Sequence, residues 1–335
     1  MARTFDTPGF RGMTFYEVQA KSIVSRVPDA SKVPFRWTIN PYRGCQHACA
    51  YCFARNTHTY LDLDAGRDFD SKVVVKVNAP ELLRAKLRSR GWTGEHIAMG
   101  TNVDCYQRAE GRYQLMRGII AALRDAANPF SILTKGTLIL RDLDLLLEAA
   151  DVTDVGLNVS AGFVDQDLWR AIERGTPAPQ RRLDACGALN DAGLRCGELR
   201  GPIVPYLSDS PSQLEAAVRQ AAAAGAVHVS PIVLHLRPGA REWFLGWLRD
   251  AHPTLVPRYA ELYGRGAYAR QEYRSRISAE VRELTERYGV GRGDLLADRV
   301  GRRAGGGRGD GGGRGVAPAA QPPREVVARE QLSLF

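Results

Sequence analysis

Three closely spaced cysteines are the residues of this sequence most able to do chemistry. Cys45, Cys49 and Cys52 lie in the run NPYRGCQHACAYCFAR, with the spacing CxxxCxxC. A 4Fe–4S cluster is normally held by four cysteine thiolates. Three thiolates leave one iron without a protein ligand, and a small molecule can chelate that iron. The loop therefore predicts an open iron–sulfur site that a bound small molecule completes.

Two other interpretations of the loop need to be weighed. His47 lies between Cys45 and Cys49, so the four residues offer a Cys3His set for zinc. Structural zinc ligands usually come as two separated pairs, and His47 is too close to its neighbours for easy tetrahedral closure. Three buried free thiols are the plainest alternative. The Gly, Gln, His and Arg residues around them do not form a hydrophobic run, so we favour the cluster.

The elements that must position this loop are predicted from hydrophobic periodicity. Each of six short apolar runs is followed by a stretch with helical spacing, as in 113–123 and 212–224. The runs lie near residues 36–40, 96–101, 130–134, 152–160, 194–204 and 226–236. Successive strand–helix units favour a parallel sheet with helices outside it. We expect an α/β fold, a partial (β/α)6 barrel of the TIM type, because a full barrel would need two more units.

Composition is that of a large enzyme without a membrane span. The 335 residues are 44% hydrophobic and 25% charged, enough for one main domain with appendages. No run of about eighteen apolar residues is present, and the first residues lack the apolar core of a signal peptide. Six cysteines in a chain of this length do not suggest disulfides, so a cytoplasmic location is expected. The net charge of +9 favours an anionic partner such as nucleic acid.

The cysteine run, with Tyr51 just before the last cysteine, resembles the signature of the radical S-adenosylmethionine (SAM) superfamily. Four further phrases resemble its spore photoproduct lyase-like branch: GTNVDCYQRAEGRYQLMRGI, SILTKGTLILRDLDLL, ERGTPAPQRRLDACGALNDAGL and GPIVPYLSD. The resemblance covers about residues 38–250. It implies a 4Fe–4S cluster on the three cysteines, SAM on the fourth iron, and reduction by a flavodoxin- or ferredoxin-type donor. SAM would then be cleaved to a 5′-deoxyadenosyl radical that abstracts hydrogen.

The same resemblance assigns SAM-binding roles at the predicted strand ends, where ligands of parallel barrels bind. The residues are Gly100, Thr101, Asn102 and Asp104 near the SAM ammonium group, Lys135 for its carboxylate, Asn158 and Ser160 for the ribose, and Tyr51 with residues near Pro231 for the adenine. The alternative for Lys135 is a surface lysine that keeps its ammonium in water.

Cys105 departs from the family pattern, which usually has TDPYQ where this chain has VDCYQ. In spore photoproduct lyase a cysteine returns a hydrogen atom to the product radical, and its position matches Gly100 here. Cys105 is a candidate for that donor, but we favour the alternative of an incidental buried thiol. Cys186 and Cys196 are expected in the core.

Five segments are expected along the chain. They are an N-terminal extension (1–35), the radical SAM core (36–250), an Arg- and Tyr-rich helical extension (251–300), a Gly-rich disordered linker (301–323) and a tail (324–335). Interleaved arginines and tyrosines suit single strands or flipped nucleotides. They also suit a helical cap with tyrosines inward, which we favour, and the two roles are compatible.

The chain ends in QLSLF, Gln331 to Phe335, which resembles the peptide by which bacterial repair proteins dock on the DNA polymerase sliding clamp. Its glutamine and three apolar side chains suit a groove; the alternative is a tail folded back on the barrel. We therefore expect a radical SAM enzyme acting on DNA. One alternative is such an enzyme acting on RNA, a protein or a small molecule, which deuterium transfer from labelled DNA would distinguish. The other is a non-catalytic, DNA-associated iron–sulfur protein that would not cleave SAM.

Overall fold

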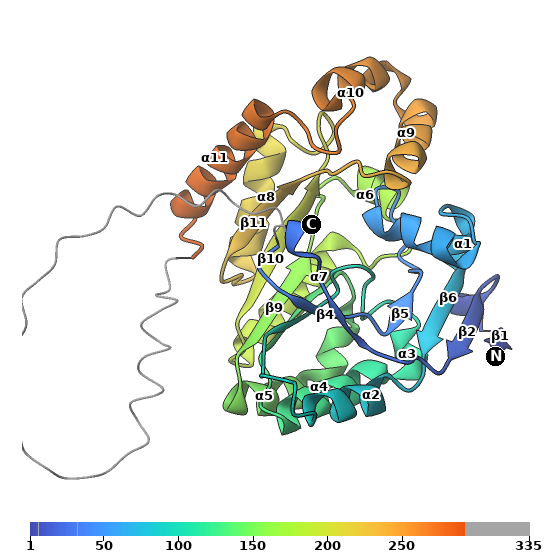
Figure 1. The fold of residues 1–335 in the computed structure, drawn as a ribbon. Coiled ribbons are helices and arrows are strands. Elements are labelled where there is room, and N and C mark those ends of the chain that lie inside the picture. The colour runs from blue at the N-terminus through green and yellow to red at the C-terminus, as the bar shows by residue number, and fades with distance from the viewer. Residues whose placement is uncertain (6, 32, 292–335) are drawn as a thin grey trace, which may run out of the picture.

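A parallel sheet dominates the computed structural model, which describes residues 1–5, 7–31 and 33–291 (Figure 1). Its strand order is β11-β10-β9-β8-β7-β4-β3. The parallel strands are β4 (Trp37–Ile39), β7 (Ile97–Met99), β8 (Phe130–Thr134), β9 (Val155–Ser160), β10 (Cys196–Ile203) and β11 (Val229–Val233). β3 (Val24–Arg26) is antiparallel to β4. This consecutive parallel order confirms the predicted partial (β/α)6 barrel.

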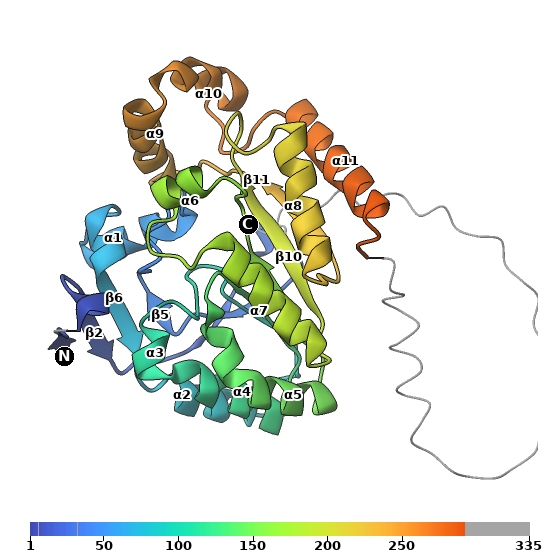
Figure 2. The ribbon, with the colours of Figure 1, turned by 180° about the vertical axis from the view of Figure 1, so that it is seen from behind.

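Helices cover the outer face of this sheet, as Figure 2 shows from behind. They are α2 (Ala79–Leu87), α4 (Leu115–Asp125), α5 (Leu143–Val152), α7 (Pro179–Asp191) and α8 (Pro211–Ala223). Three short helices lie elsewhere: α1 (Arg67–Ser71) beside β6, α3 (Glu110–Tyr113) just before α4, and α6 (Gln166–Ile172) near α9. The sequence explains α8 well. Ser210 and Gln213 form a capping box, Pro211 opens the helix, and Leu214 and Val218 are buried.

A second, smaller sheet lies beside the barrel and has the order β1-β2-β6-β5. Its strands are β1 (Ala2–Arg3), β2 (Thr14–Val18), β5 (Tyr42–Arg43) and β6 (Lys72–Lys76). β2 pairs in parallel with β6, and β5 pairs antiparallel with β6. The first 35 residues thus contribute strands to both sheets. The small sheet also anchors β5, the strand from which the cysteine loop begins.

Three helices follow β11: α9 (Ala240–Ala251) closes the expected core, and α10 (Val256–Tyr263) and α11 (Gln271–Arg287) fall in the extension expected over 251–300. Tyr259 and Tyr263 are buried and stacked on each other, and their hydroxyls donate to the carbonyls of Pro205 (2.7 Å) and Leu234 (2.8 Å). Tyr268 is instead 38% exposed. In its described part the extension is therefore a cap that turns these two tyrosines inward.

Residues 292–335 lie outside the described part of the chain, and with them the predicted Gly-rich linker (301–323) and tail (324–335). Among the described residues, no helix has the length and apolar character that crossing a membrane requires.

Candidate functional site

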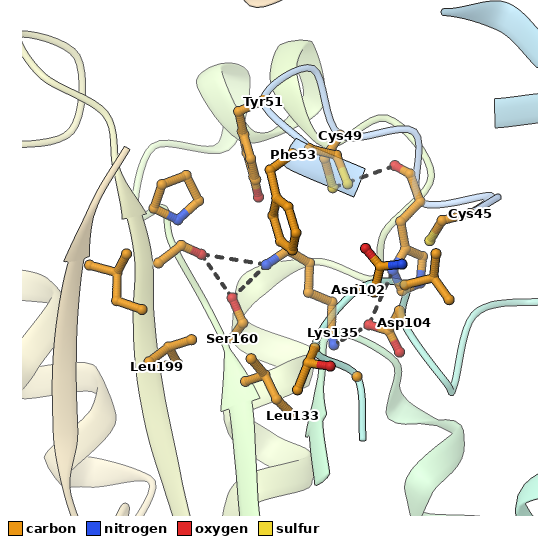
Figure 3. A pocket seen from close by; sticks show the side chains of 18 of the residues that line it. Cys45, Cys49, Tyr51, Phe53, Asn102, Asp104, Leu133, Lys135, Ser160 and Leu199 are labelled. Atoms are coloured by element: carbon orange, nitrogen blue, oxygen red, sulfur yellow. Dashed lines mark hydrogen bonds and ion pairs between the residues drawn. The ribbon is translucent and has the colours of Figure 1, made fainter. Parts of the chain in front are cut away.

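One pocket collects the sequence segments that were expected to carry chemistry (Figure 3). Its walls are residues that end or follow strands β7 to β11 and residues of the cysteine loop, 45–53. Parallel α/β sheets bind their ligands at the carboxyl ends of the strands. The pocket therefore has the position of an active site.

The cysteine loop runs from β5 to a 3-10 helix, Phe53–Leu61, and is packed closely against other backbone. A Cβ on Gly175 would lie 1.9 Å from the carbonyl oxygen of Gln46, so no side chain fits there. The Gly175 N–H donates to the His47 carbonyl at 3.1 Å. The glycine of the phrase ERGTP is thus required because that segment supports the cysteine loop.

Arg55, which follows Cys52 in the phrase YCFAR, holds the loop from within. It is fully buried, and its guanidinium donates to the carbonyls of Cys49 (2.9 Å) and Gly66 (2.9 Å) and to Asp70 (2.8 Å). A buried guanidinium with several acceptors fixes the backbone around it. Arg55 therefore fixes the fold of the loop that presents the thiols.

Gln107, from the phrase VDCYQ, is hydrogen-bonded to the start of the cysteine loop. Its amide nitrogen donates to the Gly44 carbonyl at 3.0 Å, and its amide oxygen accepts from the Gln46 N–H at 3.1 Å. This buried amide thus satisfies two loop groups that have no sheet or helix partner.

The three thiols fit an open iron–sulfur site. Cys45, Cys49 and Cys52 are free and all line the pocket. Burial raises the pKa of each thiol, so the uncharged form is favoured unless a cation is bound. Bound iron favours the thiolate. The donor set of three sulfurs is therefore suited to a cluster with one iron left for another ligand.

The zinc alternative does not fit the geometry. The His47 ring is directed to Asp104, with Nδ1 3.3 Å from a carboxylate oxygen. Within the part of the chain that the structure describes, no three His, Cys, Asp or Glu side chains are placed to hold one metal ion. A zinc ion needs ligands that converge on one point, whereas a cluster offers each thiolate a different iron.

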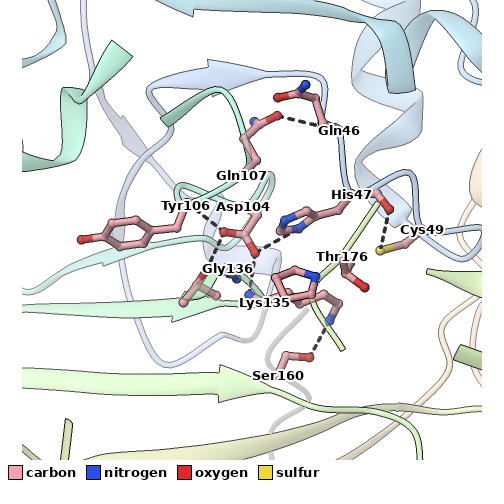
Figure 4. A network of polar contacts seen from close by, with 12 residues as sticks. Gln46, His47, Cys49, Asp104, Tyr106, Gln107, Lys135, Gly136, Ser160 and Thr176 are labelled. Atoms are coloured by element: carbon pink, nitrogen blue, oxygen red, sulfur yellow. Dashed lines mark hydrogen bonds and ion pairs between the residues drawn. The ribbon is translucent and has the colours of Figure 1, made fainter. Parts of the chain in front are cut away.

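Asp104 links the cysteine loop to the sheet, because its carboxylate oxygens are bonded to groups of the protein (Figure 4). Its carboxylate accepts from Thr134 Oγ1 (2.6 Å) and from the backbone N–H groups of Tyr106 (2.9 Å) and Lys135 (2.6 Å). The fourth partner is His47. Burial alone would raise the pKa of Asp104, but His47 and these donors lower it to about 2. The carboxylate is therefore charged and used in holding the strand ends and loop together.

Lys135 ends β8 and belongs to a second buried network. Its ammonium donates to Ser160 Oγ at 2.5 Å and lies 3.6 Å from Glu173. Glu173 accepts from the hydroxyl of Tyr51 and, at 2.5 Å, from Arg182. Burial would raise the pKa of Glu173, but Arg182 and Lys135 lower it to about 2. With its side chain 15% exposed, Lys135 is no surface lysine and faces the pocket.

Gly100, Thr101 and Asn102 also line the pocket. Gly100 has φ of 77°, and a Cβ there would lie 1.8 Å from the Leu133 carbonyl oxygen. A cysteine therefore does not fit at this position in this backbone, although the family's hydrogen-donating cysteine matches it.

Two of the predicted site residues lie outside the pocket lining. Asn158 shares a strand face with Ser160 but lies deeper in the barrel, where its Oδ1 is 2.8 Å from Nε2 of His228. Cys105 is fully buried in the hydrophobic core. Its neighbour Asp104 reaches the pocket, while the Cys105 thiol packs with core residues. The ribose role of Asn158 and the donor role of Cys105 thus have no geometric support.

Several residues that shape the site were not predicted from the sequence. Glu173, Arg182 and Arg55 are buried charges in phrases that were noted for their resemblance and not for any role. His235 lines the pocket two residues beyond β11. Its position after the sixth strand, where the other strand ends carry polar residues, was a usable signal.

A half barrel of six parallel strands, with a three-cysteine loop at its carboxyl edge, defines the class of radical SAM enzymes. The chain belongs to the radical SAM superfamily, whose family model matches residues 39–221.

Relatives and solved structures extend this finding. The uncharacterized protein Rv2578c of Mycobacterium tuberculosis is 50% identical over 288 residues, 86% of this chain and 85% of the relative. The uncharacterized protein MJ0683 of Methanocaldococcus jannaschii is 34% identical over 180 residues, 53% of this chain and 65% of the relative. A spore photoproduct lyase mutant with bound AdoMet and dinucleoside spore photoproduct has a similar fold, with a TM-score of 0.63 at 15% identity. That match covers 82% of this chain and 79% of the lyase.

Proposed function

We propose that this enzyme holds a 4Fe–4S cluster on Cys45, Cys49 and Cys52, binds SAM beside it, and abstracts hydrogen from DNA in repair or modification. When bound and reduced by a flavodoxin- or ferredoxin-type donor, the cluster and SAM together supply a 5′-deoxyadenosyl radical. The six cysteines of the described chain are free, which is consistent with work in the reducing cytoplasm.

The observation that carries the proposal is one shared pocket. Three thiols, the ammonium of Lys135 and the hydroxyl of Ser160 line the same cavity, although they come from distant parts of the chain. Lys135 supplies a positive charge for the SAM carboxylate, and Glu173 and Ser160 keep its side chain in place. Thr101 and Asn102 supply polar groups near the three thiols for the SAM ammonium.

Support for DNA as substrate comes from charge and from fold. The net charge is +9, and a basic protein favours an anionic partner. A solved structure of similar fold contains AdoMet and a dinucleoside spore photoproduct.

The test is anaerobic. The protein is reconstituted with iron and sulfide and reduced, SAM is added, and 5′-deoxyadenosine is assayed for the wild type and for Cys49→Ala. We expect product from the wild type and background from the variant. Cys186→Ala is the matched control, because that thiol lies in the core outside the pocket, and it should form deoxyadenosine like the wild type. A wild type that holds a reduced cluster and forms none would refute the enzymatic proposal.

A DNA substrate is tested separately by deuterium transfer. DNA deuterated at the sugars and bases should pass deuterium to deoxyadenosine, whereas RNA, peptide or metabolite mixtures should not. If deoxyadenosine forms without deuterium while the DNA is bound, the radical chemistry stands but DNA is not the substrate.

We further propose that residues 331–335 dock on the DNA polymerase sliding clamp. These residues lie outside the described part of the chain, and the support is their resemblance to the clamp-binding peptide. Docking would raise the effective concentration of the enzyme at DNA. Deletion of 331–335 should abolish binding to purified clamp and leave deoxyadenosine formation unchanged. Undiminished clamp binding would contradict the proposal.

A further inference from the structure

His235 is a polar residue in the pocket wall for which the described residues offer no hydrogen-bond partner. It follows β11 and lines the same pocket as the three cysteines. Both ring nitrogens are buried and have no hydrogen-bond partner within the described structure. Buried polar atoms of native proteins are almost always satisfied, and leaving them unpaired is costly. The ring is therefore placed for a ligand.

The chemistry of this corner restricts what the ligand is. Burial and the positive charges of Arg237 and Arg274 lower the pKa of His235 to about 4, so the imidazole is neutral near pH 7. A neutral imidazole offers one N–H donor and one acceptor. The rest of this wall is apolar and consists of Leu199, Pro202, Ile232 and Leu234. A flat ring with donors and acceptors on its edge, such as a nucleobase, matches both properties.

At the rim of the pocket near His235, arginine side chains lie beside aromatic rings. Arg237 lies 5.7 Å from the ring of Phe53, and its guanidinium is 3.3 Å from the Tyr268 hydroxyl. Arg274 lies 5.8 Å from the Tyr268 ring, and that ring is 4.8 Å from His235. Guanidinium groups beside partly exposed aromatic rings are the usual means of holding phosphates and bases of nucleic-acid strands.

We propose that His235 and Arg237 form a nucleotide subsite: the imidazole hydrogen-bonds the edge of one base turned out of a DNA strand, and Arg237 meets its phosphate. The assignment deepens the proposed function and rests on it. The adenine of SAM, expected near Pro231, is the competing occupant of this corner, but the SAM sulfonium is a cation and its adenosine has no phosphate, whereas Arg237 and Arg274 lie beside Tyr268 at the rim. Radical chemistry on a base or sugar requires that nucleotide to leave the stack.

The test measures base capture without chemistry. The cluster-loaded protein is titrated against a short duplex with one mismatched 2-aminopurine, which brightens when it unstacks, and against the same duplex with an abasic site. His235→Phe keeps a flat ring beside Tyr268 and removes both nitrogens. We expect about tenfold weaker binding of the 2-aminopurine duplex, unchanged binding of the abasic duplex, and partial rescue in His235→Gln.

Arg237→Gln should weaken binding of both duplexes alike and lower the salt dependence of binding. Arg249→Gln is its control, since it removes the same charge from an exposed position on α9. Loss in the control equal to that in Arg237→Gln would show a general charge effect and overturn the role of Arg237.

Stability distinguishes binding from a structural role for His235. Because His235→Phe removes two orphaned polar atoms, its melting temperature should be unchanged or higher. A lower melting temperature with equal losses on both duplexes would overturn the subsite. Reduced deoxyadenosine formation without DNA would place His235 with SAM and also overturn it. If the wild type forms deoxyadenosine but binds neither duplex, DNA is not the substrate. That result is distinct from one in which the wild type binds DNA and His235→Phe binds both duplexes equally well, which would overturn the subsite alone.

Discussion

The two walls of the pocket differ in how far the protein satisfies its own polar groups. Near the cysteine loop, each buried carboxylate that borders the pocket has several partners: Asp104 accepts from the end of β8 and contacts His47, and Glu173 pairs with Arg182 and Lys135. At the end of β11, both ring nitrogens of His235 are buried and unpaired among the described residues, and the positive charges of Arg237 and Arg274 lower its pKa.

The difference separates two tasks. A wall whose buried carboxylates are paired within the protein is preorganised, which suits groups that must hold a cofactor in one geometry. A wall with unpaired polar atoms gains its missing bonds from a ligand. On the cysteine-loop side, the expected loss is largest at Glu173, and it is smallest at Cys105 in the adjoining core.

Glu173→Gln should cause the largest loss, because it leaves Arg182 and Lys135 without their buried counter-charge. Removing one partner of a buried ion pair typically costs about 3–5 kcal/mol. Unfolding of the apoprotein in guanidinium chloride measures the loss in free energy of unfolding. Glu215→Gln, which breaks a surface pair with Arg287, should change stability by less than about 1 kcal/mol. Equal effects of the two changes would mean that the cysteine-side wall is no better bonded than the surface.

The stability that Asp104 provides should depend on pH. Its pKa is lowered from an ordinary 3.8 to about 2, so the folded protein favours the charged form. The contribution is complete above about pH 4 and is lost as the pH falls towards 2, amounting to about 2–3 kcal/mol. Unfolding measured from pH 6 to pH 2 should show this decline. Asp104→Asn should reduce the decline in that window, whereas the exposed Asp167→Asn should keep the wild-type slope.

Lys135→Met should weaken SAM binding about 10- to 100-fold, because it removes the charge assigned to the SAM carboxylate. Equilibrium dialysis with the cluster-loaded protein measures the affinity. Lys86→Met on α2, which packs on Trp37 and Trp92 away from the pocket, is the matched control. If both variants bind SAM like the wild type, the SAM carboxylate is held elsewhere.

Cys105→Ala should have the smallest effect. The thiol lies in the core and not in the pocket, so deoxyadenosine formation and product distribution should match the wild type, with a stability loss of about 1 kcal/mol. Product analysis by mass spectrometry is the check. A changed product ratio in this variant would restore Cys105 as a hydrogen donor.

The sequence predicts the barrel well because each strand is a compact apolar run with its helix beside it. It does not predict the small sheet, since β5 has two residues and β2 pairs with β6 across the distance from Thr14 to Lys72. Such pairing between distant segments leaves no local pattern. Within the site, the alternation of side chains along β9 places Asn158 and Ser160 on the same face of the strand. It does not tell how far along the strand the pocket extends, and only Ser160, at the end of β9, lines it.

The rim of the pocket is joined to the barrel by very little backbone. The loop around Tyr268 pairs with the chain beyond β11 through a single bridge at His235 and one bond from Leu236 to the Ala267 carbonyl (2.8 Å). If this rim takes the DNA strand as proposed, substitutions between residues 264 and 270 should change substrate binding and leave the fold of the cysteine loop unchanged, because so few backbone bonds join the two.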